Sequence, residues 1–356
     1  MGILIVAIGL FVGYGGAYLA SSEVRYLTRA GFEEFRILEG RRPLDQMIAD
    51  PDTDEATRGL LSLVVDVRGY ADSLGLEAGS TYTSYSDVGR DTLLVVLSAS
   101  PQDCLCPHLW KYPIVGRVPY KGFFDPAMAA KEEQKLAARG YDTYLRPSAA
   151  FSTLGWFEDP LLSTALGRDS VELAATVFHE ISHNTLYVKS ATPFNESFAQ
   201  YAGYRAAEAY FRARGDTLLA RRAADRWADE QVLGRYYAEL AGRLEAFYST
   251  SPSAAVLDSG RADAARWARA ELEGVVGPAL RTYRVGPSPE RPVNNARLIA
   301  ARIYRTRLGL FEAWHARHGE DLSAALAALT ALMAGAEGEA AFERLESALA
   351  QAPPGG

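Results

Sequence analysis

The segment 177–199 reads VFHEISHNTLYVKSATPFNESFA, and it decides how the fold of this chain is interpreted. Near its start stands the pattern H-E-x-x-H, made by His179, Glu180 and His183. On a helix, residues four positions apart lie on one face, so the two histidines would project side by side and bind one metal ion. The whole chain of 356 residues has only five histidines, so a chance match to this pattern is rare. The segment therefore predicts a helix that carries part of a metal site.

The residues around the two histidines are apolar, which predicts that this helix is largely buried. They are Val177, Phe178, Ile181 and Leu186. Two histidines and a carboxylate in such surroundings, without a metal, would lose their solvation with no compensating interaction. The alternative interpretation, a solvated helix face with incidental histidines, does not explain these flanks. We therefore expect zinc, with Glu180 as the general base that takes a proton from the attacking water.

A catalytic zinc needs a third protein ligand and one open coordination position. The metzincin pattern is excluded, because Leu186 and Lys189 occupy the positions where it requires glycine and a third histidine. Glu196 is the ligand that we predict. If residues 188–192 reverse the chain and a second helix begins near Pro193, this glutamate returns beside the two histidines. A histidine from elsewhere in the chain is the alternative third ligand: His108, His315 or His318.

At this point the sequence resembles the gluzincins, the zinc peptidases whose ligands are two histidines and a glutamate. Its segment FNESFAQY (194–201) is similar to the N-E-x-x-A segment of zinc aminopeptidases. The chain resembles still more closely a bacterial family described as predicted zinc aminopeptidases. That resemblance rests on the order and spacing of four blocks: GRVPYKGFFD (116–125), GWFEDPLLST (155–164), the segment 177–199 and NNARL (294–298). It implies a secreted or membrane-attached zinc peptidase, and it implies no particular substrate.

Two features depart from the gluzincin pattern. The link between His183 and Glu196 is shorter, so the two helices must turn tightly. Gluzincins often have an acidic residue four positions after the ligand glutamate, where it orients a histidine, and this chain has Gln200 there. The amide oxygen of Gln200 can accept the imidazole N–H, but it raises the basicity of the ligand less than a carboxylate does.

Hydrolysis of a peptide bond also needs a hydrogen-bond donor that faces the oxygen on which negative charge develops. Tyr304 is our candidate, on a helix that we expect from Asn294 to His318, and His315 is the competing candidate. The alternative role of Tyr304 is packing, because a tyrosine at helical spacing is usually a core residue.

A strand candidate at 151–157 is the nearest in sequence to the predicted zinc helix, and peptidases commonly hold the substrate backbone against a strand edge. We expect Gly155 and Trp156 to contact the substrate there, and Glu158 or Asp159 to bind a free N-terminal amine. The alternative is that these acids cap a following helix. Three polar residues of an otherwise apolar region either bind a substrate carboxylate or line a turn: Arg117, Tyr120 and Lys121.

Residues 2–20 (GILIVAIGLFVGYGGAYLA) carry no charged side chain and are near the lower length limit for a helix that crosses a bilayer. Residues 1–22 are therefore predicted to be an uncleaved signal anchor or a secretory signal peptide. The rest of the chain would then lie outside the cytoplasm, on the periplasmic side of the inner membrane or secreted. A buried core helix is the alternative. Arg25 and Arg29 argue mildly against this orientation, because positive residues prefer the cytoplasmic side.

The composition excludes one class of partner. The net charge is −7 and there is no basic run, so nothing in the sequence attracts nucleic acid. The two cysteines, Cys104 and Cys106, are separated by one residue, so a disulfide between them would be strained. With His108 they would hold a metal only if a further ligand completed the set, and a local turn is the simpler interpretation.

The pattern along the chain predicts an α+β fold, in which a small mixed sheet within 90–157 packs on a mostly helical, zincin-like body. The zinc-binding helix pair would occupy 170–214, and the helices of 215–290 would form an insertion that shapes or covers the cleft. These parts belong to one predicted peptidase domain, 23–349, followed by a disordered tail, 350–356.

Hydrophobic periodicity and turn residues set the expected elements. Strands are expected at 92–97, 112–124 and 141–145. Breaks are expected at 250–260 and 286–292. Helices are expected at 23–50 with an interruption at 42–43, and at 55–75, 126–138, 216–249, 261–278 and 321–349.

The predicted function is zinc-dependent hydrolysis of peptide bonds, in an aminopeptidase that acts on peptide or protein substrates. Two alternatives stay open. An endopeptidase would have a substrate groove open at both ends. A non-catalytic chaperone or scaffold would hold its metal with four protein ligands and leave no open position.

Overall fold

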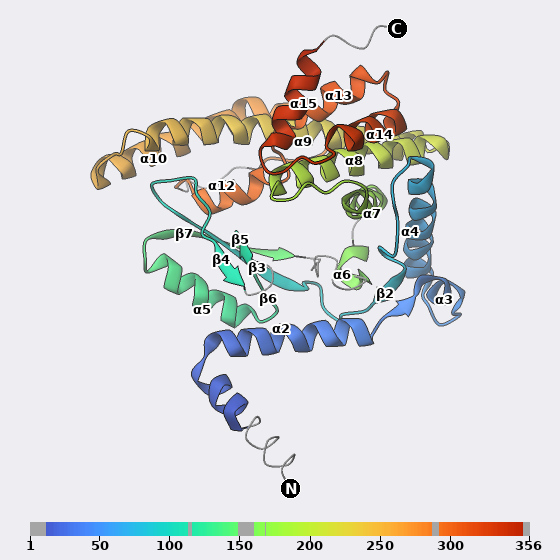
Figure 1. Cartoon of the computed structure of the whole chain (residues 1–356), viewed down its shortest axis with the longest axis horizontal. Coiled ribbons are helices and arrows are strands. Elements are labelled where there is room, and N and C mark those ends of the chain that lie inside the picture. Colours follow the sequence, from blue (N-terminus) through green and yellow to red (C-terminus); the bar gives the residue numbers. More distant parts are fainter. Residues whose placement is uncertain (1–11, 113–115, 149–159, 168, 287–291, 352–356) are drawn as a thin grey trace.

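The computed structural model describes residues 12–112, 116–148, 160–167, 169–286 and 292–351. This part of the chain is mostly helical with small sheets, so the predicted α+β class is confirmed. Figure 1 shows that most of the later helices lie on one side of the strands, and that α2 (Ser22–Glu39) runs along the opposite side. The strands therefore lie between an N-terminal helix and a large helical body.

The N-terminal part is a series of helices separated by short breaks. Residues 12–20 are helical, and α2 starts anew at Ser21, whose extended backbone and hydroxyl cap the Val24 amide. The predicted interruption is confirmed, because β1 (Arg42–Pro43) separates α2 from α3 (Leu44–Ala49). α4 (Glu55–Ser73) matches the helix predicted at 55–75 and packs on the helical body through its apolar face.

The strands form three small sheets, so the prediction of a single mixed sheet is wrong. The first sheet has the order β1–β2–β8 and is the mixed one, with β2 (Ser84–Ser86) parallel to β8 (Leu161–Leu162). The second is antiparallel, with the order β6–β3–β7: β6 is Lys121–Phe123, β3 is Leu94–Pro101 and β7 is Tyr141–Ser148. The third is the hairpin of β4 (Trp110–Tyr112) and β5 (Gly116–Val118). Short strands and intervening turns kept these segments from pairing in one sheet.

The second sheet has its own small core on the side of α5 (Pro126–Ala137), which begins at the Asp125 cap as predicted for 126–138. Leu97 of β3 and Phe123 of β6 pack there against Ala129 and Leu136 of α5. β3 is the central strand of this sheet, and β7 forms one edge. This edge strand carries Arg146, which belongs to the candidate site described in the next section.

The helical body is built on three long helices. α7 (Ser170–Thr185) starts at Asp169, whose carboxylate accepts hydrogen bonds from the amides of Val171 and Glu172. α8 (Thr192–Ala213) starts beside Pro193, and α9 (Thr217–Tyr248) follows after a short turn. All three agree with the predicted helices. Their buried aromatic and aliphatic side chains form the main core together with α4 and the C-terminal helices.

The helices after α9 differ from the prediction at two places. α10 (Ala254–Glu271) begins well inside the expected break at 250–260, because Leu257 packs into a second core against the C-terminal half of α9. The chain continues through the π-helical turn η1 (Leu272–Val276) and α11 (Gly277–Ala279). The composition of this region is polar, and the tertiary contact decided its conformation.

The single helix expected from Asn294 to His318 is two helices, α12 (Asn295–Arg302) and α13 (Leu308–Arg317). Arg307 has a left-handed backbone (φ 52°), which a continuing helix cannot contain. The segment expected as one helix at 321–349 is likewise divided, into α14 (Leu322–Leu332) and α15 (Ala340–Ala350), at the left-handed glycines 335 and 338.

Among the residues that the structure describes, no helix is long and apolar enough to cross a membrane. Residues 1–11, about half of the predicted anchor, lie outside the described residues. Most of the predicted tail, 352–356, does so as well.

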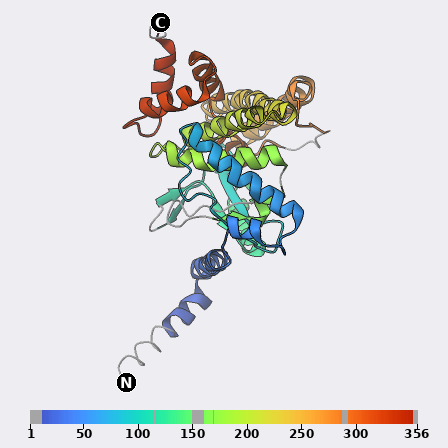
Figure 2. The ribbon, with the colours of Figure 1, turned by 90° about the vertical axis from the view of Figure 1, so that its right-hand side faces the viewer.

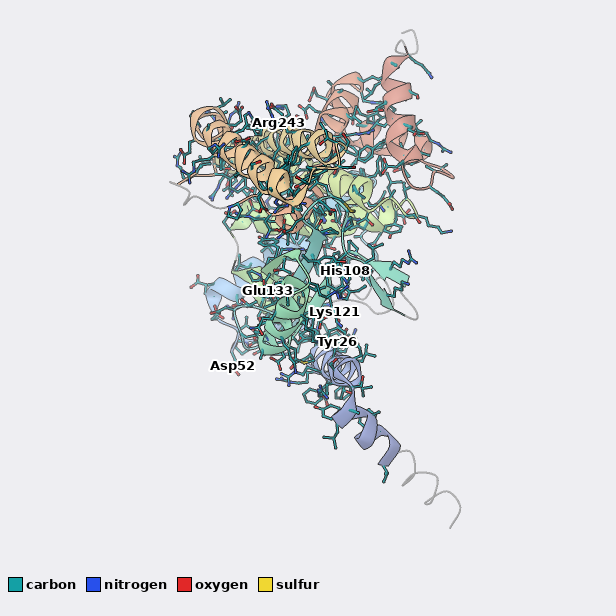
Figure 3. The ribbon with its side chains drawn as sticks, turned by 90° about the vertical axis from the view of Figure 1, so that its left-hand side faces the viewer. Tyr26, Asp52, His108, Lys121, Glu133 and Arg243 are labelled. Carbon is teal, nitrogen blue, oxygen red and sulfur yellow. A yellow bond between two sulfur atoms is a disulfide. The ribbon has the colours of Figure 1, made fainter. Side chains whose placement is uncertain are left out.

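The structure joins Cys104 and Cys106 in a disulfide, with their Cα atoms 5.3 Å apart. The predicted simple turn is therefore a covalently closed one, and neither sulfur is available as the thiolate ligand considered with His108. The imidazole of His108 packs instead against Trp110 and Tyr141, with ring centroids 4.6 and 5.5 Å away. Figure 3 shows His108 above Lys121 and Tyr26, and the partners of His108, Trp110 and Tyr141, belong to the same small core as Tyr26 and Phe123.

Candidate metal centre and active site

The tight turn between α7 and α8 is held by a buried asparagine. The Asn195 side chain accepts a hydrogen bond from the Val188 amide and donates one to the Val188 carbonyl, both at 2.8 Å. Asn195 therefore satisfies both backbone groups of a residue in the link, which a buried turn requires. The chain reverses between Thr185 and Thr192, as the short link predicted.

Close packing of α7 on α8 depends on Gly203. A Cβ at this position would lie 2.7 Å from the Ala175 carbonyl oxygen and 3.4 Å from the His179 Cβ. No side chain fits at the first distance, so only glycine lets the two backbones approach this closely. Gly203 lies seven residues after Glu196, which puts both on the same face of α8. Sequence reasoning missed this residue, and its spacing from Glu196 was the available signal.

The structure brings the three predicted metal ligands together. The Nε2 atoms of His179 and His183 lie 3.3 and 3.9 Å from the same oxygen, Oε2 of Glu196. All three ligand atoms are within 4.8 Å of one another. Ligand atoms about 2.0–2.2 Å from a tetrahedral zinc ion lie roughly 3.3–3.5 Å apart, so small side-chain movements would complete such a site. Among the described residues, this is the group whose side chains have the composition and spacing of a zinc site.

The protonation states of these residues suit a cation. Burial of His183, with the neighbouring charge of His179, lowers its pKa to about 4, so the imidazole is neutral at pH 7 and its nitrogen lone pair can bind a metal. Burial alone would raise the pKa of Glu196. The hydrogen bond from His179 and the charges of His179, His183 and Arg146 outweigh burial and lower this pKa, so Glu196 is ionised.

Tyr304 lies at the site, but in the turn between α12 and α13 and not on a helix as predicted. Its ring centroid is 6.1 Å from that of His179. Two neighbours of Tyr304 hold this turn. Arg305 pairs with the buried Glu230 of α9 at 2.7 Å, and the Thr306 amide donates to the Ser197 hydroxyl of α8 at 2.9 Å. Burial, and after it the charge of Glu196, raises the pKa of Tyr304, so its hydroxyl keeps its proton.

Arg146 and Tyr120 complete the group of polar side chains near Glu196. The charge of Arg146, at the end of β7, lowers the pKa of Glu196 and of both tyrosines, Tyr120 and Tyr304. Burial raises the pKa of Tyr120, and the charge of Glu196 raises it further. Tyr120 was predicted as a polar residue of uncertain role. Arg146 was missed, although an arginine just before Pro147 at a strand end was a possible signal.

The other predicted site residues have different outcomes. The Nδ1 atom of His183 is buried and has no hydrogen-bond partner among the described residues, so Gln200 does not orient that ring in this structure. Lys121 is nearly fully buried and pairs with Glu23 of α2 at 2.9 Å, which makes it a link between β6 and α2. The charge of Glu180 contributes to the raised pKa of Tyr304, after burial and the charge of Glu196. Three predicted substrate contacts lie outside the described residues: Gly155, Trp156 and Glu158.

His315 does not compete with Tyr304 at this site. Its Nδ1 lies 2.8 Å from the Tyr201 hydroxyl and its Nε2 lies 3.1 Å from the Glu320 carboxylate, so both ring nitrogens are engaged in the core between α8 and α13. The Nδ1 of His318 contacts the Trp314 carbonyl at 2.8 Å. Both histidines therefore lie in contacts of their own, and Glu196 is the residue that the structure places beside His179 and His183.

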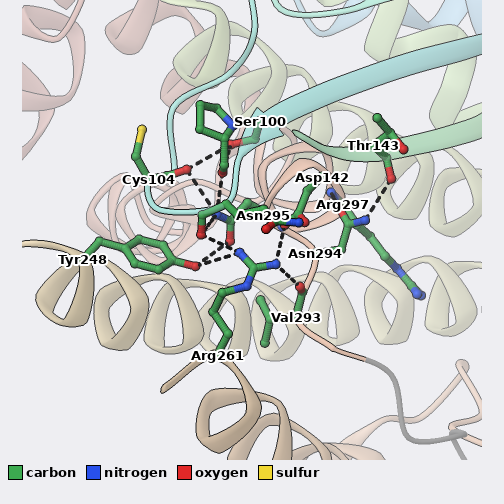
Figure 4. Close-up of polar contacts among 12 residues, drawn as sticks. Ser100, Cys104, Asp142, Thr143, Tyr248, Arg261, Val293, Asn294, Asn295 and Arg297 are labelled. Carbon is green, nitrogen blue, oxygen red and sulfur yellow. Dashed lines mark hydrogen bonds and ion pairs between the residues drawn. The ribbon is translucent and has the colours of Figure 1, made fainter. Parts of the chain in front are cut away.

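The block NNARL has a structural role. The side-chain amide of Asn295 donates to the carbonyls of Pro101, Gln102 and Cys104, and its backbone N–H donates to the Asp142 carboxylate. Figure 4 shows these bonds around the buried ion pair of Asp142 and Arg261, whose atoms are 2.7 Å apart. Asn294 caps α12 and donates to the Thr143 carbonyl. The block therefore fixes α12 against the strands, and α12 leads directly to Tyr304.

A family model described as "Putative aminopeptidase" matches residues 25–343. The chain belongs to this family. The matched range contains the helix pair α7–α8, the strands and the turn of Tyr304, so the family relation covers the whole site. Membership supports a peptidase, a hydrolase that acts on peptide substrates. No curated protein and no solved structure was found to match the chain.

Proposed function

We propose that this chain is a zinc-dependent aminopeptidase of the gluzincin type. The observation that carries the proposal is the convergence of His179, His183 and Glu196 around one point. The donor set fits zinc, because two neutral imidazoles and one carboxylate are a common catalytic combination. Three protein ligands leave a coordination position for substrate or water, which favours an enzyme over a scaffold with a closed site.

When bound, zinc would lower the pKa of a water molecule and polarise the carbonyl of the substrate. Glu180 follows His179 on the same helix, and its carboxylate would accept the proton of the attacking water and deliver it to the leaving amine. The Tyr304 hydroxyl keeps its proton and would donate a hydrogen bond to the oxygen that becomes negative. Arg305 and Thr306 would keep this hydroxyl in place during the reaction.

The test of this proposal is a metal and activity measurement on matched variants. We expect the purified chain to bind about one zinc ion and to cleave peptides, and Glu180→Gln to keep the zinc while kcat/KM falls by about 10²–10⁴. Glu337→Gln is the control, since Glu337 is exposed and pairs with the exposed Lys189 in the link between α7 and α8. A chain that binds no zinc after reconstitution, or a Glu180→Gln variant as active as the wild type, would contradict the proposal.

Action at a free N-terminus is the part of the proposal that rests on the family description. We expect peptides with a free amino terminus to be cleaved and the same peptides to resist cleavage once acetylated, because the lost charge removes a recognised group. Equal cleavage of both forms would identify an endopeptidase. Equal results with zinc-loaded and chelator-treated protein would exclude metal dependence in either case.

We also propose that residues 2–20 attach the chain to a membrane, with the peptidase body outside the cytoplasm. The support is the uncharged, apolar composition of this segment. Flotation of the full chain with lipid vesicles tests this attachment.

A further inference from the structure

The surface of the described chain exposes large apolar side chains mainly near its beginning. Seven of the fourteen exposed large apolar side chains lie within residues 12–35: Val12, Tyr14, Tyr18, Leu19, Leu27, Phe32 and Phe35. A cluster of exposed apolar side chains indicates a region that contacts a membrane or another protein. Three of the seven belong to α2, and their exposed fractions are 54% for Leu27, 54% for Phe32 and 60% for Phe35.

The three side chains of α2 share one side of the helix. At 3.6 residues per turn, Leu27, Phe35 and Phe32 fall within an arc of about 140°. The opposite side faces the body of the protein, where Glu33 and Ile37 are buried and the Tyr26 ring packs on Phe123 at 5.3 Å. On its outer side α2 therefore keeps three apolar side chains more than half exposed, with the Tyr14 hydroxyl bonded to Thr28 between them and Glu39 at the C-terminal end of the same side, and on its inner side it packs on the protein.

Three arginines border this apolar side along one flank of the helix. On the same helical projection, Arg25, Arg29 and Arg36 fall within about 40° of one another, beside Phe32. Arg29 and Arg36 are exposed at 48% and 58% although both lie near the buried carboxylate of Glu33. The Glu33 carboxylate also forms an ion pair with Arg90 at 3.0 Å, so one carboxylate lies near three guanidinium groups. An apolar strip with a cationic border matches the acyl and phosphate layers of a lipid surface.

The position of α2 in the molecule agrees with this match. Figures 1 and 2 show the strands and the helical body all on one side of α2. The helical residues 12–20 leave on the other side, after the break at Ser21. Arg25 stabilises this corner, since its guanidinium donates to the carbonyls of Tyr18 and Leu19 at 2.8 and 3.0 Å. Residues 12–20, which carry no charged side chain, thus directly precede α2 in the chain.

A pocket of about 230 Å³ opens beside the N-terminal half of α2, between this helix and α5. Its walls are apolar at Tyr26, Phe123 and Met128, and Arg25 and Lys131 stand among its lining residues. Figure 3 shows Tyr26 and Lys121 side by side where α2 meets β6. The Lys121 ammonium lies 4.2 Å from the centre of the Tyr26 ring. This contact and the Lys121–Glu23 ion pair join α2 to the sheet that carries Arg146.

We propose that α2 lies flat in the lipid–water interface, with Leu27, Phe32 and Phe35 in the acyl layer and its arginines at the phosphates. The proposal rests on membrane attachment through residues 2–20 and assigns a second contact, made by a helix that does not cross the bilayer. Because α2 is fixed to β6, this contact would hold the peptidase body in one orientation relative to the membrane.

The test uses the full chain in phosphatidylcholine vesicles that contain phosphatidylglycerol. A dye sensitive to its surroundings is attached at Phe35→Cys in one variant and at Leu218→Cys in another. Leu218 is the matched control, because it is equally apolar, 76% exposed and on α9 in the helical body. The native cysteines are paired in a disulfide and do not take up the dye. We expect quenchers carried on lipid chains to quench the dye at position 35 and not at position 218.

Flotation, the molecular mass and a triple variant distinguish the possible reasons for a failure. Loss of flotation would show that residues 2–20 do not attach the chain, whereas flotation with an unquenched dye at position 35 would overturn the flat position of α2 alone. Protection of that dye in the absence of lipid, with a doubled molecular mass, would mean that a second copy covers the face and would also overturn the proposal. The combined change of Leu27, Phe32 and Phe35 to Gln should leave the circular dichroism spectrum unchanged and abolish quenching of a dye placed at Gly31→Cys.

Discussion

A Cβ on Gly203 would lie 2.7 Å from the carbonyl oxygen of Ala175, so the helix that carries Glu196 and the helix that carries the histidines approach more closely than a side chain at position 203 would allow. The distance from Glu196 to His179 depends on this contact. The site is therefore sensitive to changes that leave every candidate metal ligand in place.

We expect Gly203→Ala to separate α7 from α8, to destabilise the protein by about 1–3 kcal/mol and to weaken zinc binding. Denaturant unfolding and a competition assay with a zinc-binding dye measure the two effects. The control is Gly242→Ala in α9, where an added Cβ meets nothing within 4 Å and alanine should stabilise the helix by up to about 1 kcal/mol. Unchanged zinc affinity in Gly203→Ala would mean that the helix spacing does not set the site.

Replacement of Asn195 should open the turn between the two helices. Asn195→Leu leaves the buried amide and carbonyl of Val188 without partners, at a cost of about 1–3 kcal/mol for each group. Asn195→Asp keeps the acceptor for the amide but sets a carboxylate oxygen against the Val188 carbonyl, so its loss of stability should also be measurable. Thermal unfolding of both variants, with zinc content, checks this. A stable Asn195→Leu variant with full zinc content would contradict it.

Tyr304→Phe should reduce kcat by roughly 10²–10³ and leave KM and zinc content nearly unchanged, because the lost hydrogen bond forms only as negative charge develops on the substrate. The control is Tyr187→Phe, which removes an exposed hydroxyl in the link between α7 and α8. Steady-state kinetics on one peptide decide the matter. A rise in KM with an unchanged kcat would assign Tyr304 to substrate binding instead.

Stability should fall as the pH is lowered, in part because of His315. Burial, and after it the charge of Arg205, lowers the pKa of His315 below its ordinary value of 6.5, despite the opposing charges of Glu320 and Glu312. The folded state thus binds fewer protons than the unfolded state once the pH falls below 6.5, so the free energy of unfolding decreases there. We expect a smaller decrease in His315→Gln, since glutamine does not titrate. Denaturant unfolding of both metal-free proteins between about pH 7.5 and about pH 5 measures the difference.

Arg261→Met should destabilise the protein by about 3–5 kcal/mol, because it leaves the buried carboxylate of Asp142 without its partner. The same change removes hydrogen bonds of 2.6 Å to the carbonyls of Gln102 and Val293 (Figure 4). Arg266→Met is the control, since its ion pair with Asp263 is solvent-exposed and should contribute less than about 0.5 kcal/mol. Equal stabilities of the two variants would show that the ion pair of Asp142 does not hold α12 in place.

Much of the helical body could be predicted because its signals are local. Apolar periodicity and the Asp169 cap define α7, so the two histidines had to share one face. Pro193 and the short link before it predicted an antiparallel α8, and that topology alone brings Glu196 to the histidines. The residues that carry the candidate chemistry are close in sequence, and their geometry follows from one helical turn and one reversal.

The surroundings of this pair were decided by contacts between residues that are distant in the sequence. The left-handed Arg307, with the bonds of Arg305 to Glu230 and of Thr306 to Ser197, turned an expected helix into the bend that presents Tyr304. The charge of Arg146 acts on Glu196 because β7, which carries Arg146, pairs with β3 at the edge of its sheet. Sequence by itself determined the candidate metal-binding motif, since a helix repeats every 3.6 residues whatever surrounds it. Tertiary structure decided what faces that motif, because packing between distant segments leaves no periodic signal in the chain.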